Sequence, residues 1–350
     1  MTSVAEADTG TITQRPRAST VARDGAIDTM RGIAILMVIG IHALQQPLDA
    51  SWKIALDAFL RPCVPIFLFA SGYLTGLSGR VPVAKRLVAT VIPYAIAFVA
   101  AYLYMALLNP AMDHRITTTI ARFGLAYVFV YYYVFVYIGC TLLLWLVFWF
   151  ATRIPEQSEQ RLQVLLLIAI AFGLITGSYL DPALAHFGLA DGVIEEFRMR
   201  DIPFWFAFAA LGMLVARASI RDILLDMLPT LAVATLVAYA IYIAVRIIGI
   251  GDAAAYDSTA FFGYAAALSV LLLASRIDVP LLASLGSGSY FIYLWHIFVI
   301  MALRDLGGFR ALGGVAATIL IYVIALAITG AALLALRQWA PPRVLRYLGA

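Results

Sequence analysis

Charged residues are scarce in this chain of 350 residues. Asp, Glu, Lys and Arg together make up 13% of it, against about 25% in an average soluble protein. Hydrophobic residues make up 63% and gather in long runs, which excludes a soluble globular domain. The composition predicts a polytopic membrane protein that contacts membrane lipids and no nucleic acid.

Cysteines and the common catalytic motifs are scarce or absent as well. The two cysteines, Cys63 and Cys140, lie inside apolar runs without the spacing of metal ligands, so we expect packing residues and no metal site. The sequence has no glycine-rich phosphate loop, no serine nucleophile elbow and no His-Glu-x-x-His zinc motif. Catalysis by this chain would therefore use general acid–base groups.

Ten apolar segments approach the length of about 20 residues that a helix needs to cross a bilayer. With the N-terminus in the cytoplasm, 14 of the 24 Lys and Arg residues fall inside and nine outside, with Arg31 left out because it lies within a segment. This bias predicts an all-α fold of about ten transmembrane helices with both termini cytoplasmic. We expect a disordered cytoplasmic tail over 1–24, the membrane domain over 25–338 and a short cytoplasmic tail over 339–350. The segments are 27–44, 56–77, 87–108, 125–150, 162–180, 202–216, 227–250, 260–274, 288–303 and 311–336.

The first segment carries three polar residues on one helical face. Asp28 lies three residues before Arg31. His42 follows eleven positions after Arg31, which is three turns and about 16 Å along a helix. Because a cation and an imidazole are costly inside a membrane, they indicate a functional path. Arg31 can bind an anionic donor, and His42 can take a proton from a hydroxyl. The alternative for Arg31 is an anchor whose side chain snorkels to the inner interface. The alternative for His42 is an interfacial residue at the outer end of the helix.

Five other residues have a structural and a functional interpretation. Ser71 allows close helix packing or a local opening. Lys85 and Arg86 satisfy the positive-inside rule or meet a nucleotide phosphate. Tyr133 belongs to a tyrosine-rich stretch that favours an interfacial aromatic belt, with a sugar-stacking platform as the alternative. His296 is either a second functional imidazole or a hydrogen bonder between helices.

Four patches of the chain together resemble the membrane-bound acyltransferase family 3, a group that includes polysaccharide O-acyltransferases. The first patch is DTMRG (28–32) followed by His42, with Thr29 where the family usually has Gly. The second is VPIFLFASGYL (64–74), the third is the aromatic stretch 131–143, and the fourth is SYFIYLWH (289–296). The family tends to have two arginines three positions apart before the third span, whereas this chain has Arg86 and then Ala89.

The resemblance implies transfer of an acyl group, usually acetyl, from cytoplasmic acyl-CoA to a hydroxyl. His42 corresponds to the residue regarded as catalytic and Arg31 to its essential partner. We expect Asp28, beside Arg31, to belong to the catalytic set. His42 is expected to act as a general base in direct transfer, with an acyl-His intermediate as the alternative. Acyl-CoA would be bound by Arg31, Lys85, Arg86 and Ser71, with His296 and Tyr133 as a possible second site. We expect acetyl-CoA as donor and no metal.

The acceptors that the resemblance implies are surface or secreted glycans, lipid-linked sugars, peptidoglycan and small natural products, and among these we favour a hydroxyl of a surface or secreted glycan. The enzyme would be a multi-pass protein of a bacterial-type inner (cytoplasmic) membrane. The alternative class is a transporter or flippase of a glycan or lipid-linked sugar, since such a protein also needs intramembrane charge. No internal repeat of the kind that builds many transporters is seen in the sequence.

Overall fold

The computed structural model describes residues 24–44, 47–109, 111–128, 130–153, 157–218, 220–249, 259–305, 308 and 314–350. Every regular element in these ranges is a helix, which confirms the predicted all-α class. The predicted tail 1–24 lies outside the described residues except for Asp24. The helices are α1 (Gly25–Ala43), α2 (Ser51–Leu60), α3 (Cys63–Ser78), α4 (Val83–Leu108), α5 (Ile116–Gly124), α6 (Tyr132–Thr152), α7 (Ser158–His186), α8 (Asp191–Met199), α9 (Ile202–Arg217), α10 (Arg221–Asp226), α11 (Leu228–Ile248), α12 (Thr259–Ser275), α13 (Pro280–Ser287), α14 (Ser289–Asp305), α15 (Gly314–Trp339) and α16 (Pro342–Leu348).

Eight helical segments of the described chain are long and apolar enough to cross a membrane, when α2 with α3 and α8 with α9 are each counted as one. The pair α13 and α14 is a ninth candidate, bent by 80° at its break. α12 is apolar but has only 17 residues. Each of the ten predicted segments overlaps one of these helices, so the multi-pass membrane fold is confirmed. The count of ten and the cytoplasmic termini stay predictions.

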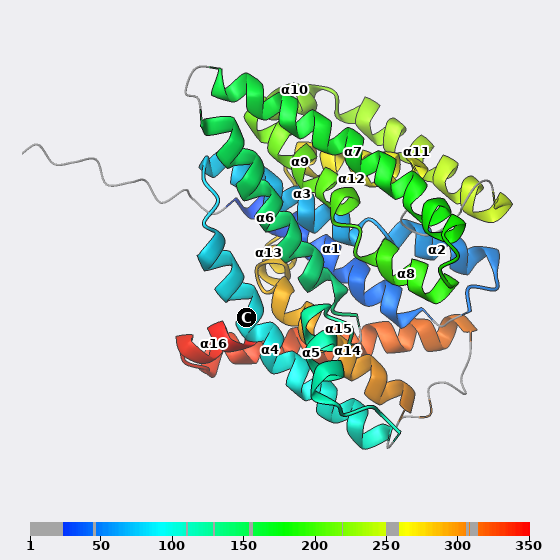
Figure 1. Cartoon of the computed structure of the whole chain (residues 1–350). Helices are drawn as coiled ribbons and strands as arrows, with labels where there is room; N and C mark the ends of the chain where they lie inside the picture. Colours follow the sequence, from blue (N-terminus) through cyan, green and yellow to red (C-terminus); the bar gives the residue numbers. More distant parts are fainter. Residues whose placement is uncertain are drawn as a thin grey trace, which may run out of the picture.

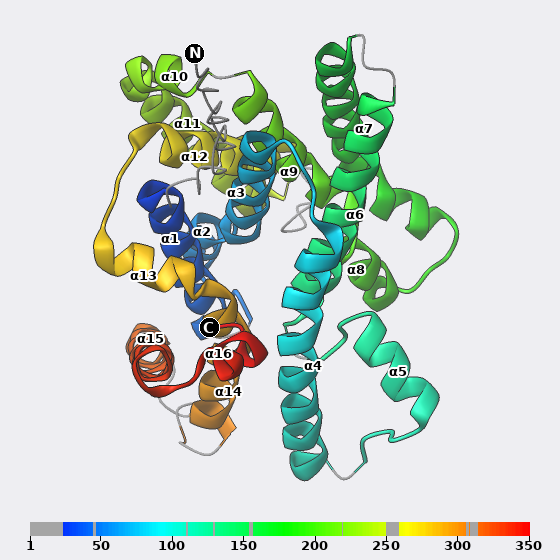
Figure 2. The same ribbon diagram turned by 90° about the vertical axis from the view of Figure 1, so that its left-hand side faces the viewer.

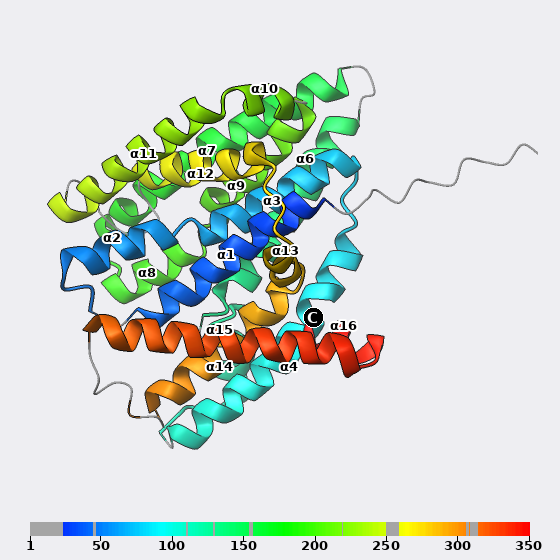
Figure 3. The same ribbon diagram turned by 180° about the vertical axis from the view of Figure 1, so that it is seen from behind.

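The helices α1 and α3 lie in the middle of the molecule. In Figures 1 and 3 they run between a group made of α7, α9, α11 and α12 and a group made of α4, α14 and α15. Figure 2 shows α4 passing along one side of this central pair and α13 on the other. Of the membrane-spanning stretch, 72% of the residues are buried in α1 but only 11% in α11. α1 is therefore largely enclosed by protein, with Asp28 buried and Arg31 and His42 half-buried.

Glycines bring α3 and α9 close together. A Cβ atom on Gly72 of α3 would lie 1.9 Å from the carbonyl oxygen of Ala209, and one on Gly212 of α9 would lie 2.0 Å from that of Phe69. Only glycine fits at either position, because both distances are far below a van der Waals contact. Small residues are the usual means by which membrane helices approach each other. This contact fixes α3, which carries Ser71, against the core.

The start of α1 is fixed by an aspartate. The side chain of Asp24 accepts hydrogen bonds from the amides of Ala26 and Ile27, at 3.0 and 3.4 Å, and so caps the helix. The same carboxylate pairs with Arg221 at 2.7 Å. Burial acts to raise the pKa of Asp24, but the bonds from Arg221 and the two amides bring it below its usual value. α1 therefore starts at Gly25 in a defined position.

The short helix α13 packs directly on the first half of α1. A Cβ atom on Gly32 would lie 2.1 Å from the carbonyl oxygen of Leu282, and one on Gly286 would lie 1.8 Å from that of Asp28. The two backbones are thus in contact next to Arg31. The chain then bends at Gly288, between α13 and α14, so that α14 begins beside the polar face of α1.

Candidate active site

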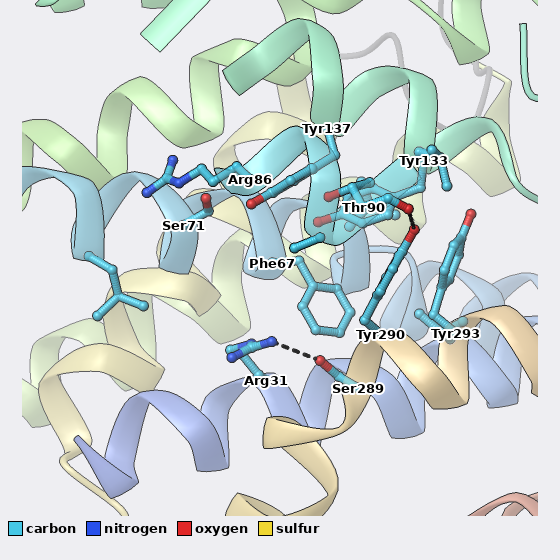
Figure 4. A pocket seen from close by; sticks show the side chains of 15 residues that line it. Arg31, Phe67, Ser71, Arg86, Thr90, Tyr133, Tyr137, Ser289, Tyr290 and Tyr293 are labelled. Atoms are coloured by element: carbon cyan, nitrogen blue, oxygen red, sulfur yellow. Dashed lines mark hydrogen bonds between the residues drawn. The ribbon is translucent and has the colours of Figure 1, made fainter. Parts of the chain in front are cut away.

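The polar face of α1 holds Arg31 between two partners. One nitrogen, Nη1, lies 3.4 Å from Oδ1 of Asp28, one turn earlier on the same helix. The other, Nη2, donates to the hydroxyl of Ser289 at 3.2 Å, as Figure 4 shows. Since Ser289 is the first residue of α14, the bend after α13 brings this hydroxyl to Arg31. The predicted pairing of Asp28 with Arg31 is present in the structure.

A cavity of about 330 Å³ opens next to this guanidinium, and we call it the Arg31 cavity. Figure 4 shows Arg31 and Ser289 on one side of it and Arg86 on the other. Nη2 of Arg86 donates to the hydroxyl of Thr75 at 2.6 Å, whereas its buried Nη1 has no hydrogen-bond partner among the described residues. The cavity is lined by Arg31, Val38, Val64, Phe67, Ser71, Leu74, Arg86, Ala89, Thr90, Tyr133, Val134, Tyr137, Ser289, Tyr290 and Tyr293.

The fold thus brings together three of the four residues expected to bind the donor. Arg31, Ser71 and Arg86 line the same cavity, although they come from α1, α3 and α4. Lys85 is exposed and does not line it. Successive residues on a helix point in directions about 100° apart. Because Arg86 points into the cavity, its neighbour Lys85 points away from it.

A second cavity, of about 270 Å³, surrounds His42, and we call it the His42 cavity. Four residues line both cavities: Val38, Val64, Tyr133 and Tyr293. The two spaces are therefore neighbours along α1, with Arg31 facing one and His42 facing the other. The His42 cavity is lined by Val38, Ile41, His42, Leu44, Arg61, Cys63, Val64, Val130, Tyr132, Tyr133, Met199, Tyr293 and Arg304.

The end of α1 is held in place next to His42 by an arginine of α14. Nη2 of Arg304 donates to the carbonyl oxygen of His42 at 2.7 Å and to that of Leu44 at 3.1 Å. The last carbonyls of a helix lack partners within the helix, and a guanidinium is a good donor for them. Arg304 therefore fixes the backbone that carries the His42 ring.

His296 lies directly beside His42. The two rings are 5.3 Å apart between centroids, and His296 has no exposed surface. Its Nδ1 is 2.9 Å from the carbonyl oxygens of Ile292 and Tyr293. Because carbonyl oxygens only accept, Nδ1 must carry the proton, which leaves Nε2 as a bare acceptor. That Nε2 is buried and has no hydrogen-bond partner in the described part of the chain.

Three tyrosine hydroxyls join α14 to the elements across the cavities. Tyr290 donates to the carbonyl oxygen of Thr90 at 2.7 Å (Figure 4), and Tyr293 donates to that of Val130, also at 2.7 Å. Tyr131 donates back to α14 at 2.8 Å and has no exposed surface. Because Tyr131 is buried and Tyr133 lines both cavities, the interpretation as an interfacial belt is wrong for these two residues. A sugar-stacking role for Tyr133 stays a prediction.

A sequence model of the acyltransferase family 3, described as an acyltransferase domain, matches residues 24–335. The chain belongs to this family. It is a membrane acyltransferase, as the four patches of resemblance predicted. No curated protein and no solved structure gives a significant match to the chain.

One departure from the pattern of acyltransferase family 3 has a visible consequence. Ala89, which stands where a second arginine is common, lines the Arg31 cavity one turn after Arg86. Because Ala89 carries no charge, Arg86 is the one cation that α4 contributes to the described lining of this cavity. In this acyltransferase, Arg31 and Arg86 supply the positive charge around the space.

Sequence reasoning missed several residues that line the two cavities. Arg61 and Arg304 were counted only as topology signals, yet both line the His42 cavity. Ser289 and Tyr293 were noted only as parts of a motif. Their position in the late SYFIYLWH patch was the available signal, because that patch also contains His296. No group of three or more potential metal ligands is found in the part of the chain that the structure describes.

Proposed function

We propose that this acyltransferase is an O-acyltransferase that moves an acyl group, most simply acetyl, from cytoplasmic acyl-CoA to a hydroxyl of a surface or secreted glycan. The observation that carries the proposal is the pair of adjoining cavities on α1, one lined by Arg31 and the other by His42. A donor held by its phosphates in the first can present its thioester in the second.

The Arg31 cavity suits the donor by charge. Acyl-CoA is anionic, and guanidinium groups form the strongest hydrogen bonds to phosphate. Arg31 and Arg86 line the cavity, and the buried Nη1 of Arg86 has a proton to donate. Ser71 adds a hydroxyl to the same wall. Lys85, exposed at the start of α4, would meet only a part of the nucleotide that extends beyond the cavity.

The His42 cavity suits the chemical step. His42 takes the proton of the acceptor hydroxyl while that oxygen attacks the thioester carbon. The carbon–sulfur bond breaks, and the proton passes from His42 to the sulfur, which leaves as the free thiol of CoA. The step needs one group that accepts and then returns a proton, and an imidazole is suited to this at neutral pH.

His296 is proposed to position His42 for this step. The centroid separation of 5.3 Å is close to the value of about 5 Å that one N–H···N hydrogen bond between two imidazoles gives. In the reacting complex, one nitrogen of His42 would donate to Nε2 of His296, which leaves the other nitrogen as the base. Such contacts often tighten only when substrate is bound.

The sidedness of the reaction follows from the predicted topology. With the N-terminus in the cytoplasm, Arg31 lies near the cytoplasmic end of α1, where acyl-CoA is made, and His42 lies towards the opposite face. The enzyme would work in a bacterial-type inner membrane, with 25–338 as the catalytic domain and 339–350 as a cytoplasmic tail. The acceptor would then reach His42 from outside the cell.

The test is transfer of radiolabelled acetyl from acetyl-CoA to a panel of methyl glycosides by the purified protein in proteoliposomes. We expect labelled glycoside, and we expect His42→Ala to lower kcat by about 10²–10⁴-fold, because general-base help is worth that much. Binding of acetyl-CoA should stay unchanged. His186→Ala, which removes an exposed imidazole at the end of α7, is the matched control.

Two results would contradict the proposal. One is full transfer by His42→Ala. The other is transport of the glycoside across the membrane without transfer of the radiolabelled acetyl group to it, which would indicate a transporter or flippase.

A further inference from the structure

The transfer proposed above places a negative charge on the carbonyl oxygen of the thioester. As the acceptor oxygen bonds to the carbonyl carbon, an electron pair of the C=O double bond moves onto that oxygen. A hydrogen-bond donor fixed in advance at this place stabilises the transition state, and one such donor is worth about 10²–10³ in kcat. In the proposed step, one nitrogen of His42 is the base and the other donates to His296. Another group must therefore meet the oxyanion.

The junction of the two cavities is the place to look for this donor. A donor molecule that extends from the Arg31 cavity into the His42 cavity presents its thioester next to the residues that line both. Two of these four residues are valines, whose side chains have no polar atom, and two are tyrosines. The hydroxyl of Tyr293 already donates to the carbonyl oxygen of Val130 at 2.7 Å. The other tyrosine is Tyr133.

The hydroxyl of Tyr133 makes no hydrogen bond within the part of the chain that the structure describes. Its neighbours differ, since Tyr131, Tyr290 and Tyr293 each donate to a main-chain carbonyl oxygen. The Tyr133 oxygen is also not sealed off by surrounding atoms, so it is accessible from the cavities that the residue lines. Because tyrosine hydroxyls inside proteins usually have a partner, an accessible one without a partner is available to a ligand.

The ring that carries this hydroxyl is held by three aromatic neighbours. It packs against Tyr293 of α14 at 5.4 Å between centroids, with the ring planes 73° apart. It also contacts Phe67 of α3 at 6.1 Å and Tyr137, one turn later on α6, at 6.0 Å. Contacts from three helices fix the direction of the hydroxyl before substrate binds, which is the condition for an effective oxyanion donor.

The same aromatic packing connects this ring to the proposed base. The ring of Tyr293 lies 6.4 Å from that of His296, and His296 lies 5.3 Å from His42. The hydroxyl donor and the imidazole are therefore held by one continuous set of ring contacts along α14. A thioester at the junction can then have the phenol at its oxygen and the acceptor, activated by His42, at its carbon.

We infer that Tyr133 is a catalytic residue whose hydroxyl donates a hydrogen bond to the thioester carbonyl oxygen as the acceptor attacks. Tyr133 keeps its proton throughout the reaction. When the carbon–sulfur bond breaks, the electron pair on the oxygen forms the carbonyl double bond again, and the negative charge is lost. This inference rests on the proposed function and adds a residue to the same chemical step.

Tyr133→Phe tests the inference, because it removes one oxygen atom and keeps the ring. We use the full-length protein in proteoliposomes, radiolabelled acetyl-CoA, and the methyl glycoside that the unchanged protein acylates fastest. We expect kcat to fall by about 10²–10³-fold, with kcat/KM falling equally, since the interaction is made only in the transition state. Acetyl-CoA affinity, measured by calorimetry, should be unchanged, which also shows that the variant is folded.

Two further variants separate the hydroxyl from the ring. Tyr179→Phe removes the same atom from an exposed tyrosine of α7 and should leave kcat unchanged. Tyr133→Leu removes the ring as well as the hydroxyl. If the ring also stacks on the sugar, this variant should raise the KM for the glycoside beyond that of Tyr133→Phe.

Two results would overturn the inference and leave the proposed function standing. One is full kcat in Tyr133→Phe, with only Tyr133→Leu impaired, which would make Tyr133 a sugar-stacking residue. The other is weaker binding of acetyl-CoA by Tyr133→Phe, because the hydroxyl would then serve donor binding or the fold. Absence of acetyl transfer by the unchanged protein would overturn the proposed function and this inference together.

Discussion

The Arg31 cavity and the His42 cavity both contain two arginines, yet they differ in how those arginines are held. In the first, Arg31 is held by the carboxylate of Asp28 and the hydroxyl of Ser289, and Arg86 by the hydroxyl of Thr75. In the second, Arg61 is held by a carboxylate, and main-chain carbonyls orient its partner on α14. Among the described lining residues, an imidazole is found only in the second, so a base and not charge distinguishes the two ends.

The same two helices, α1 and α14, contribute residues to both cavities and set the distance between them. α1 places Arg31 in one and His42 in the other, about 16 Å apart along its axis. α14 begins with Ser289 beside Arg31 and brings His296 beside His42 seven positions later, about 10 Å along. The rigid rise of two packed helices therefore sets the distance between the Arg31 guanidinium and the His42 imidazole.

The largest expected effect comes from the close packing of α3 on α9, because Val64 of α3 lines both cavities. Gly72→Ala should drive α3 away from α9, because the new Cβ would meet the carbonyl oxygen of Ala209 at 1.9 Å. We expect a loss of about 3 kcal/mol or more in stability, enough to lose most folded protein. Gly263→Ala, on α12 with open space around it, should be neutral or slightly stabilising.

Thermal unfolding of the detergent-solubilised proteins, followed by size-exclusion chromatography, checks this pair. If Gly72→Ala kept the unfolding temperature and the acetyl-CoA affinity of the unchanged protein, the close contact between α3 and α9 would be wrong. The common wall of the two cavities would then need another origin.

The sequence predicted well those features that lie within one helix. The apolar segments located the helices, and the period of 3.6 residues placed Asp28 and Arg31 on one face. Membrane helices can be located by hydropathy and length alone, so α1, α4 and α15 were predicted without knowledge of their neighbours. The segment 288–303 also began at the break between α13 and α14, although α13 itself was not expected.

Contacts between distant helices could not be predicted in this way. Ser289 meets Arg31, and His296 meets His42, because glycines let α13 lie on α1 and turn α14 towards it. Hydropathy carries no information about which membrane helices are neighbours, since every lipid-facing surface is equally apolar. For the same reason nothing in the sequence indicated that Arg61 and Arg304 line the same cavity.

The second prediction concerns the imidazole pair that distinguishes the His42 cavity. His296→Leu should lower kcat by about ten- to a hundredfold, because His42 would lose the acceptor that selects its basic nitrogen. His296→Gln, whose amide oxygen can accept the same hydrogen bond, should regain part of the rate. Trp295→Phe, the neighbouring change on α14, should stay within about threefold.

Further measurements distinguish the proposed positioning role of His296 from a purely structural one. Acetyl-CoA affinity should be unchanged in His296→Leu, and the pH at which kcat/KM is half-maximal should shift relative to the unchanged protein. In the unchanged protein, nitrogen NMR should find the proton of His296 on Nδ1, as its two carbonyl partners require. A proton on Nε2, or a normal pH profile in His296→Leu, would contradict the positioning role.

The smallest effect is expected from two adjacent cations of α4, which sharpen the assignment of the Arg31 cavity to the donor. Arg86→Gln should raise the KM for acetyl-CoA about tenfold, because a charge-assisted hydrogen bond to phosphate is lost from an enclosed space. Lys85→Gln should change it by less than about twofold, since that side chain is exposed and its charge is screened by solvent. Steady-state kinetics at fixed acceptor, in low and in physiological salt, measure both. Equal effects of the two changes would mean that the nucleotide binds on the surface of α4, and the Arg31 cavity would then have to receive some other part of the reaction.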